Sequence, residues 1–504
     1  MTTLAQLKGK TIHIVGASGI EGTALLLYLA GELGIEGIVA HDFAADQASF
    51  ARSFHKNNIA WSASERERIL PVLRALPVRY CMGTNYLQGI DTAELIFASQ
   101  NWFNYPANRP ALDQAIAAGA QLLGILDLGL ALFAGRRITV SGSNGKSTTA
   151  SLIAHLLEAC SGPTGQVLLS GNERTRQVPL QELAACSSQD VAIWEVSNRH
   201  LRDRSVRGDI AVLTNITPNH IEDHGSWEAY AAAKKRLVLA PGSGGHAVLC
   251  AIDPHSVAIQ NEVRASGAQL WLFGKAPPSG SCDGHCWIEA NRLRLQLPGG
   301  LRLELGDPSL LALTGAHNQL NLQAALCALA ASAWVETTQL NAQQLEPLYR
   351  SAPTLEGRLE LVGEAQGVRW IYDIQATTAP AATVGIRAMA REAQRIVLLV
   401  GGEDKGMDYT SMAEQARRHC ALIISLPGSG TEAFLNALGS GPEVARCKDL
   451  EEALPLARDR SQAGDVVLLS PGSAFFYRAF IDGGPSYRER VRAILPTDPR
   501  QETT

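Results

Sequence analysis

The stretch Ile138–Ala150, ITVSGSNGKSTTA, decides the fold of the middle of the chain. A β-rich run at its start ends at Ser141-Gly142, and a loop of small residues leads into Gly145-Lys146-Ser147-Thr148. Apolar residues then recur at helical spacing from Leu152 to Cys160. A strand, a glycine-rich loop and a helix in this order are typical of a phosphate cradle, because the N–H groups and the dipole at a helix N-terminus attract anions.

The residue types of this loop indicate their roles. Lys146 would reach the terminal phosphates of a nucleotide, and the Ser147 hydroxyl would bind magnesium. The full pattern requires a glycine five positions before Gly145, where this chain has Val140, so the match is the shorter G-x-x-G-K-S. An ordinary helix-opening turn is the alternative, but the flanking strand and helix favour a nucleotide site. The predicted loop comprises Gly142, Ser143, Asn144, Gly145, Lys146, Ser147 and Thr148.

Composition limits the class of protein. A chain of 504 residues is expected to form two to four domains, and 46% hydrophobic with 18% charged residues indicates globular domains. The net charge of −5 gives no basic face for nucleic acid. No run is apolar enough to enter a membrane, and no leader is apparent. Nine cysteines without regular spacing indicate reduced thiols in the cytoplasm.

Residues 1–136 read as a Rossmann-like N-terminal domain that binds a nucleotide substrate. A strand over Thr11–Val15 leads into a glycine loop, Gly16–Gly22, and an apolar helix through Leu25–Leu33, and a second strand ends at His41-Asp42. Glycines let a phosphate approach the backbone, and an acid at the second strand can bind a ribose hydroxyl. The spacing departs from G-x-G-x-x-G, so an NAD site, a nucleotide-sugar pocket and a structural turn stay open. The aromatic stretch 99–106 is either a ligand loop or a packed surface loop.

Residues 137–350 alternate strands with helices, which predicts a central P-loop-type ATPase domain with a mostly parallel sheet. The strand Val191–Glu195 ends in a carboxylate, which suits magnesium or a solvated strand end. The next strand runs into 215–225, where His220 and neighbouring acids could ligate a metal or cap the helix Trp227–Leu239. Residues 293–305 alternate around Pro-Gly-Gly, which predicts a hairpin. The trio Cys282, His285 and Cys286 could suggest zinc, but it has no second ligand pair, and coincidence is favoured.

Residues 351–504 predict a third, Rossmann-like domain. Strands at 370–373, 396–400 and 466–470 each end in a loop with polar residues or glycines. The pattern again favours a doubly wound α/β sheet. The expected fold class is therefore α/β with three domains, divided at 136/137 and 350/351.

Ten motifs, in order, give the chain a resemblance to the Mur ligases, most closely to the branch that adds glutamate. They are SGSNGKSTT at 141–149, GN at 171–172, WEVS at 194–197, NITPNHIEDHG at 215–225, YAAAK at 230–234, GAHNQLN at 315–321, Arg358 after a Pro-containing link, YDIQATT at 372–378, GGEDKG at 401–406 and LLSPGSA at 468–474. The resemblance covers essentially the whole chain. It implies domains for UDP binding, ATP binding and amino-acid binding. It also implies an acyl phosphate made with ATP and displaced by an amine with release of ADP.

The resemblance further implies residue roles. Catalytic roles fall to Lys146, Glu195, His220 and Lys234, and two Mg²⁺ sites to Ser147, Glu195, His220 and Lys234, with Lys234 carbamylated and Lys235 an ordinary solvated lysine. ATP is expected to contact the phosphate loop, Asn318, Asn321, Arg358 and Asp373, with His317 beside the adenine. The UDP-linked substrate and the amino acid are expected to contact Ser18, Asp42, Asn172, Lys405, Ser470 and Phe475.

The sequence departs from the family in the substrate pockets. Gln375 replaces a lysine, Phe475 replaces a serine, Asn219 replaces an aspartate, and Gln100-Asn101-Trp102 replaces Pro-Gly-Ile. The resemblance implies a cytoplasmic monomer that adds glutamate to UDP-N-acetylmuramoyl-L-alanine in peptidoglycan precursor synthesis. The alternative is a Mur-like ligase that uses another acid or amine, for L-glutamate addition or for formation of a secondary-metabolite amide. A silent ATP sensor is disfavoured because the catalytic residues are intact.

Overall fold

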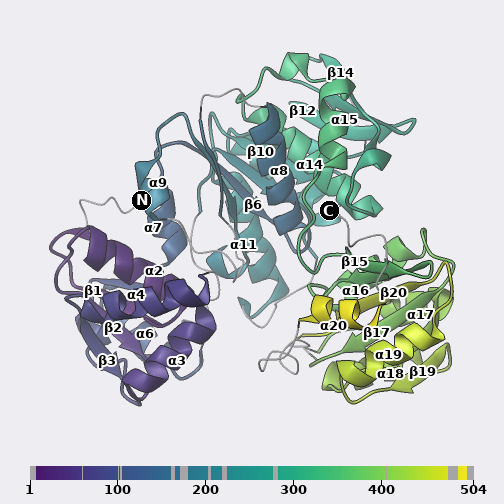
Figure 1. Ribbon diagram of the computed structural model, residues 1–504. Coiled ribbons are helices and arrows are strands. Elements are labelled where there is room, and N and C mark those ends of the chain that lie inside the picture. The colour runs from purple at the N-terminus through teal and green to yellow at the C-terminus, as the bar shows by residue number, and fades with distance from the viewer. Residues whose placement is uncertain are drawn as a thin grey trace. The chain divides into compact units, whose positions relative to one another are not determined.

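The computed structural model describes residues 7–58, 61–99, 102, 105–160, 165–170, 180–201, 206–217, 224–275, 282–404, 406–474 and 486–495. Three sheets follow one another along the chain, each flanked by helices (Figure 1). The chain forms two compact units: residues 1–308 with 321–348, and residues 309–320 with 349–504. The expected α/β class is confirmed. Within the described residues, no helix is long and apolar enough to cross a bilayer.

The first sheet is parallel, with five strands in the order β3-β2-β1-β4-β5. The strands are β1 (Ile12–Val15), β2 (Val39–Asp42), β3 (Arg79–Met82), β4 (Leu95–Ala98) and β5 (Gln121–Leu123), and the helices are α2 (Ile20–Leu26), α3 (Gln47–Asn57), α4 (Ala63–Ala75) and α6 (Arg109–Ala117). The sequence predicts one regular helix after the glycine loop. Instead, α2 continues as a π-helical segment η1 (Leu27–Glu32), in which Leu33 N–H donates to the Tyr28 carbonyl.

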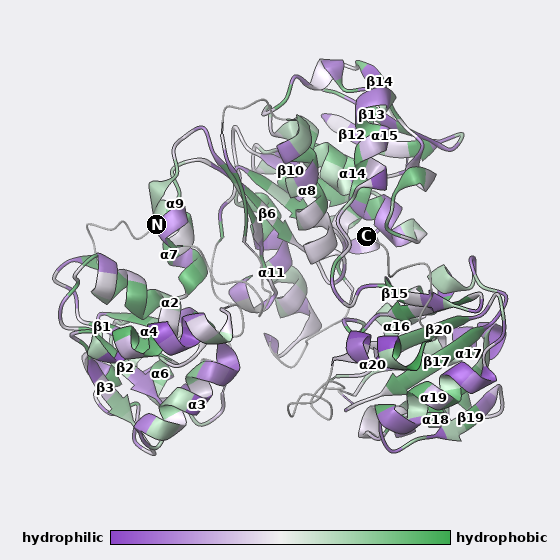
Figure 2. Cartoon of the chain, viewed as in Figure 1, coloured by the Kyte–Doolittle hydropathy of each residue, from purple (hydrophilic) through white to green (hydrophobic). Residues whose placement is uncertain are grey.

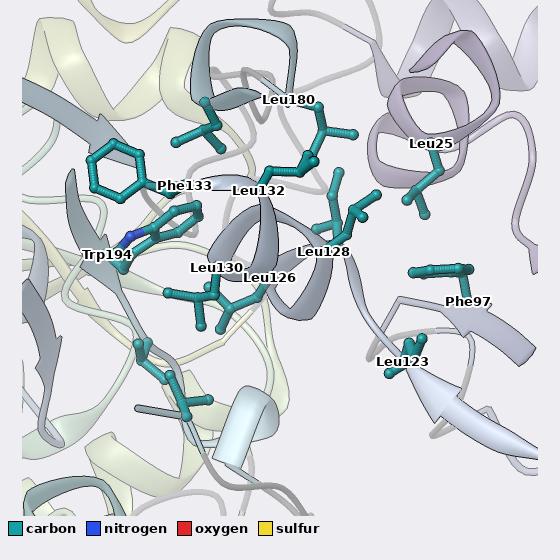
Figure 3. Close-up of a cluster of buried hydrophobic side chains, with 14 of the residues drawn as sticks. Leu25, Phe97, Leu123, Leu126, Leu128, Leu130, Leu132, Phe133, Leu180 and Trp194 are labelled. Atoms are coloured by element: carbon teal, nitrogen blue, oxygen red, sulfur yellow. The ribbon is translucent and has the colours of Figure 1, made fainter. Parts of the chain in front are cut away.

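Helix α7 (Ile125–Leu132) connects the first sheet to the second one. Apart from Asp127 in its first turn it is apolar, and its leucines are buried in one hydrophobic cluster. The same cluster contains Leu25 of α2, Phe97 of β4 and Trp194 of β8 (Figure 3). The leucines of α7 lie between these residues (Figure 3). The first two sheets therefore share a core.

The second sheet has nine strands in the order β14-β13-β12-β11-β10-β9-β6-β8-β7. Its strands are β6 (Arg136–Ser141), β7 (Val167–Ser170), β8 (Val191–Glu195), β9 (Ile210–Leu213), β10 (His246–Cys250), β11 (Gln269–Gly274), β12 (Gly284–Glu289), β13 (Arg292–Gln296) and β14 (Arg302–Gly306). All pairs from β7 to β12 are parallel, whereas β12, β13 and β14 form an antiparallel extension. The predicted hairpin around Pro-Gly-Gly is confirmed as β13 and β14.

The main helices around the second sheet are α8 (Lys146–Cys160), α9 (Leu180–Ala185), α11 (Trp227–Leu239), α12 (Pro254–Ala258), α13 (Gln260–Ala265), α14 (Ala316–Ala331) and α15 (Ala342–Arg350). Helix α8 begins at Lys146, directly after the glycine loop. Its predicted apolar positions Leu152, Ile153, Leu156 and Leu157 are buried. The sequence pattern therefore positions the phosphate loop between β6 and α8, as predicted.

The third sheet has six strands in the order β15-β16-β20-β17-β18-β19. Its elements are β15 (Glu360–Ala365), β16 (Val368–Tyr372), β17 (Ile396–Gly401), β18 (Cys420–Ser425), β19 (Glu443–Arg446) and β20 (Val466–Gly472), with α16 (Ala379–Met389), α17 (Thr410–His419), α18 (Ser429–Leu438), α19 (Leu450–Arg460) and α20 (Tyr487–Ile494). Only β15 is antiparallel to its neighbour.

Successive residues of the central strands point to opposite faces of the third sheet. Leu398 belongs to the cluster beneath α16, α17 and α18, while Leu399 belongs to the cluster beneath α19 and α20. Burial on both faces explains why residues 396–400 of β17 and 466–469 of β20 are all hydrophobic (Figure 2). The predicted strand ends at 372–373 and 470–472 meet at the same edge of this sheet.

Candidate active site

The phosphate loop, Gly142–Gly145, is held in a conformation that only glycine fits at two positions. Gly145 has a φ of +81°, and a Cβ there would overlap the Asn321 carboxamide, whose Cγ would lie 3.2 Å away. A Cβ at Gly142 would overlap the Thr214 side chain. The loop is thus closely surrounded by other parts of its unit, which fixes the direction of its backbone groups.

Side chains that follow β9, together with one from α11, hold the loop in place. Thr214 Oγ1 donates to the Asn144 carbonyl at 2.5 Å, and Asn144 N–H donates to Asn215 Oδ1 at 3.0 Å. Ser143 Oγ shares a hydrogen bond with the Tyr230 hydroxyl at 2.8 Å. Burial raises the pKa of Tyr230 to about 12, so this hydroxyl keeps its proton. The loop is therefore preorganised before a nucleotide binds.

Two lysine side chains meet at this loop. Lys146 Nζ donates to the carbonyl oxygens of Gly142 and Ser143, each at 3.1 Å. Lys234 Nζ also donates to the Gly142 carbonyl, at 3.0 Å, and lies near Ser141 Oγ at 3.3 Å. Lys234 comes from α11 and is completely buried. The predicted catalytic lysines are therefore together.

The environment of Lys234 disfavours its charged form. Burial, and then repulsion by the Lys146 ammonium, lower the pKa of Lys234 well below its usual value. Its Nζ lies 5.0 Å from the centre of the Tyr230 ring, one helical turn away on α11. The adjacent Lys235 is different, because it pairs with Glu262 at 2.9 Å on the exposed side. Lys234 and Lys235 thus lie in different environments, one buried and one at the surface.

The predicted metal ligands Ser147 and Glu195 lie in α8, which follows β6, and at the end of β8, the neighbour of β6 in the second sheet. Glu195 is the last residue of β8 and lies opposite Val140 of β6, just before the phosphate loop. Both side chains are largely buried, and Thr148 follows Ser147 in the first turn of α8. Carboxylate and hydroxyl oxygens are the ligands that Mg²⁺ prefers, so these residues fit that ion. The predicted His220 lies outside the described residues.

The predicted adenine residues open α14. Asn321 Oδ1 accepts a hydrogen bond from Thr149 Oγ1 at 3.3 Å and lies against Gly145, so Asn321 contacts the phosphate loop. Asn318 belongs to the compact unit that contains residues 309–320. Its Nδ2 donates to the Thr314 carbonyl of the same unit at 2.7 Å. The structure thus places Asn321 beside the nucleotide loop, and the adenine role of both residues stays a prediction.

In the third sheet, the predicted nucleotide residue Asp373 is bonded to the predicted substrate residue Ser470. Ser470 Oγ donates to Asp373 Oδ2 at 2.8 Å, and Leu359 N–H donates to Oδ1 at 3.2 Å. Burial raises the pKa of the Asp373 carboxyl to about 7, although the Ser470 and Leu359 hydrogen bonds and the charge of Arg358 favour ionisation. A Cβ at Gly385 of α16 would lie 2.8 Å from Asp373 Oδ2. Asp373 and Ser470 therefore form one buried polar pair.

The predicted substrate residues of the first sheet, Ser18 and Asp42, are also bonded to each other. Both side chains are completely buried. Asp42 Oδ2 accepts from Ser18 N–H at 2.8 Å and from Ser18 Oγ at 2.7 Å. Their contact with a substrate stays a prediction. Asn172, Lys405 and Phe475 lie outside the described residues.

Sequence reasoning assigned no role to Thr214, Asn215 or Tyr230, which shape the phosphate loop. Tyr230 precedes Lys234 by four residues, so the helical spacing alone places both on one face. Thr214 and Asn215 follow a strand whose parallel neighbour carries the loop. The zinc alternative finds no support: His285 and Cys286 are successive residues of β12 and face opposite sides of the sheet, and the described residues contain no group of three ligands.

Comparison with known proteins agrees with this geometry. Residues 140–329 match the Mur ligase middle domain, and residues 357–472 match the Mur ligase glutamate ligase domain. A UDP-N-acetylmuramoylalanine--D-glutamate ligase of Symbiobacterium thermophilum is 30% identical over 427 residues, which are 84% of this chain and 89% of the relative. A ligase of the same name from Paramagnetospirillum magneticum is 29% identical over 511 residues, which are 98% of this chain and 99% of the relative.

Solved structures share the fold. A MurF ligase from Thermotoga maritima in complex with ADP has a TM-score of 0.53 at 18% identity, over 79% of this chain and 93% of that one. The UDP-N-acetylmuramate-alanine ligase MurC from the same organism has a TM-score of 0.53 at 16% identity, over 96% and 99%. The chain belongs to the Mur ligase family, whose members are ATP-dependent, ADP-forming amide ligases.

Proposed function

We propose that this ligase adds glutamate to UDP-N-acetylmuramoyl-L-alanine, with ATP as the source of energy. The observation that carries the proposal is the convergence of Lys146 and Lys234 on one carbonyl of the phosphate loop. Two amines beside a nucleotide cradle suit a reaction in which ATP and a carboxylate gather many negative charges. The names of the relatives that span most of the chain supply the identity of the acid and the amine.

The chemistry divides into two transfers. The substrate carboxylate oxygen attacks the γ-phosphorus of ATP, the bond to the β-phosphate oxygen breaks, and ADP leaves. The amine of the amino acid then attacks the acyl carbon, and inorganic phosphate leaves with the former carboxylate oxygen as the amine loses a proton. Lys146 is suited to hold the transferred phosphoryl group, because its ammonium lies over the loop that receives the phosphates.

We further propose that Lys234 acts as a carbamate. Burial and the nearby Lys146 charge lower the pKa of Lys234 and so favour its neutral amine, which can attack carbon dioxide, forming an N–C bond and releasing one proton. The carbamate would give Ser147 and Glu195 an additional oxygen ligand for Mg²⁺. A Mg²⁺ ion held by these residues would supply positive charge that offsets the negative charge of the phosphates. His220 is proposed as a further ligand from the sequence resemblance.

We propose that the nucleotide contacts Asn318, Asn321, Arg358 and Asp373, and that the substrates contact Asn172, Lys405, Ser470 and Phe475. A second candidate function differs only in the amine. Gln375 is exposed and follows Asp373 closely, at a position where the resemblance implies a lysine. A neutral amide there favours an amine other than D-glutamate, because a side-chain carboxylate would lose a cationic partner.

The test is ADP release measured together with product mass, for a matrix of acids and amines. UDP-N-acetylmuramoyl-L-alanine with D-glutamate should release ADP and give the product heavier by one glutamyl residue. L-Glutamate and other amino acids in the same matrix test the second candidate. Failure of every amine with this acid, combined with turnover of a different acid, would contradict the proposed substrate.

A further inference from the structure

The carboxyl edge of the first sheet carries an aromatic surface, formed by Phe43, Tyr86 and Trp102. We propose that Phe43 and Trp102 bind the nucleobase of the nucleotide-linked substrate by stacking, and that they determine its selection in place of a phosphate-binding glycine loop. This inference rests on the proposed function, because the UDP group comes from there. It concerns which side chains recognise that group.

The first four backbone donors of the glycine loop after β1 are already used within the protein. Gly16 N–H and Ala17 N–H both donate to the His41 carbonyl, at 2.8 and 3.2 Å. Ser18 N–H donates to Asp42, and Gly19 N–H donates to the Gly16 carbonyl at 3.0 Å. A phosphate cradle needs N–H groups that point toward the anion. These four consecutive donors point into the protein instead.

The acid at the end of β2 is used internally as well. Asp42 is completely buried and accepts hydrogen bonds from Ser18 N–H, from Ser18 Oγ and from Ala44 N–H. A ribose hydroxyl would have to displace one of these bonds to reach the carboxylate. The two features that predict a nucleotide site from the sequence therefore stabilise the loop itself.

Trp102 covers the loop where a phosphate would approach. Gly16 has a φ of +88°, and a Cβ there would lie 2.6 Å from both Cδ1 and Cε2 of the Trp102 indole. The indole thus packs directly on the Gly16 backbone. Gly16 permits the close approach of an aromatic ring of this same chain, which a side chain at position 16 would prevent.

The rings around Trp102 form a continuous surface. The Phe43 ring centre lies 5.1 Å from that of Trp102 at an interplanar angle of 41°, and Tyr86 packs edge-on against Trp102 at 5.8 Å. The Tyr86 hydroxyl donates to Asn108 Oδ1, and Asn108 Nδ2 donates to the Trp102 carbonyl at 2.8 Å. These bonds fix the Trp102 backbone, while Phe43 is 59% exposed.

An exposed Phe43 ring beside a half-buried Trp102 ring, at the carboxyl edge of a parallel sheet, suits a planar ligand, since ligands of such sheets bind at that edge. Stacking on a base uses π-faces and needs no phosphate-binding amides. We therefore assign the base to Phe43 and Trp102. The sugar and the acid of the substrate would then extend away from the covered loop.

The experiment is calorimetric titration of the full chain with UDP and with UDP-N-acetylmuramoyl-L-alanine. Phe43→Ala and Trp102→Ala should each weaken binding of both ligands by about 10-fold or more, the range for a lost base stack. Phe43→Tyr and Trp102→Phe keep a ring and should bind within about 3-fold of wild type. Val72→Ala is the matched control, because Val72 of α4 is an apolar residue that is 52% exposed and does not belong to the aromatic surface.

A second readout separates this inference from the proposed function. The KM for the UDP-linked acid should rise in Phe43→Ala while the KM for ATP stays unchanged. If Phe43→Ala and Trp102→Ala bind UDP as wild type does, or if wild type does not bind UDP, the inference is wrong. If UDP binding depends on both rings but no amide forms with UDP-N-acetylmuramoyl-L-alanine, the aromatic site stands and the proposed acid is wrong.

Discussion

Lys146 Nζ and Lys234 Nζ both donate to the carbonyl oxygen of Gly142, at 3.1 and 3.0 Å. Two ammonium groups on one acceptor repel each other, and the completely buried Lys234 is the one whose pKa falls. A neutral Lys234 beside a charged Lys146 resolves this repulsion. Lys146 and Lys234 lie side by side but are therefore expected to have different chemical roles, which separate substitutions can measure.

Lys146→Ala should abolish ADP formation and amide formation together. The substitution removes the cation that holds the transferred phosphoryl group, and loss of such a contact commonly lowers kcat by about 100-fold or more. The measurement is ADP release with saturating substrates, with circular dichroism as the control for folding. Turnover at the wild-type rate would contradict the assignment of the phosphate loop.

Lys234→Ala should be nearly inactive, and millimolar acetate should restore part of the activity, because a free carboxylate can supply the missing oxygen ligand. Lys235→Ala is the matched control: Lys235 is the next residue in the chain but pairs with Glu262 at the surface, so activity should stay close to wild type. Activity of the wild type should fall as pH decreases through the lowered pKa of Lys234, because protonation removes the nucleophilic amine. Full activity of Lys234→Ala would disprove the carbamate.

Gly145→Ala should weaken ATP binding and slow turnover by about 10-fold or more, since the new methyl group would displace Asn321. Gly244→Ala isolates this effect. Gly244 has a φ of +85°, close to the +81° of Gly145, but no atom lies within 4 Å of a Cβ there. Both variants should lose about 1–2 kcal/mol of stability from the left-handed backbone. Equal ATP affinity in the two variants would show that the contact with Asn321 is unimportant.

Asp373 should make the stability of the protein decrease as pH rises from about 4 to about 7. Its pKa is about 7 in the folded chain against 3.8 as the ordinary value, so the folded state binds more protons between these limits. Above about pH 7 this contribution is constant. Thermal unfolding of Asp373→Asn across pH 4.5–8 should show a smaller slope, and Glu364→Gln on the exposed side of β15 should leave the slope unchanged.

The same measurement on Ser470→Ala gives an independent check. The Ser470 hydrogen bond favours the ionised Asp373 carboxylate, so its removal should raise the pKa of Asp373 in the folded chain. The pH range over which stability decreases should then extend to higher pH. An unchanged slope in Asp373→Asn would mean that Asp373 does not titrate in this range.

Gln375→Lys combined with Phe475→Ser should change the preferred amine while ADP formation on the acid is retained. A lysine at 375 would add a cation for a side-chain carboxylate, and a serine at 475 would add a hydroxyl donor. Initial rates for D-glutamate, L-glutamate and alanine compare the variant with wild type. An identical amine profile would show that these two departures do not set the specificity.

Local patterns predicted the elements well. Val191–Glu195 and Trp227–Leu239 have the predicted bounds, because a short apolar run and a helical stripe are encoded by neighbouring residues. The phosphate loop was predictable for the same reason, since strand, glycines and helix lie within thirteen residues. The π-helical turn at Leu27–Glu32 was missed, because its hydrogen bonds depend on how the segment packs.

Partners that are distant in the sequence could not be predicted. The Asp373–Ser470 bond joins residues 97 positions apart, and nothing in either motif indicates whether the carboxylate faces a ligand or a neighbouring strand. Asp42 has the position of a ribose-binding acid, yet its bonds to Ser18 depend on the fold of the loop. Side-chain orientation at a strand end follows from such tertiary contacts, which spacing does not contain.

Helix α7 has a consequence for cooperativity. Its leucines lie in one core with Leu25, Phe97 and Trp194, so a fragment that begins at residue 137 would expose a large apolar surface (Figure 3). The first two sheets should therefore melt in a single transition, although their sequences read as separate domains. Exchange of the N-terminal region between homologues would succeed only when α7 and the residues around Trp194 are exchanged with it. The segment that must be exchanged as a whole to transfer substrate choice is thus larger than one sheet.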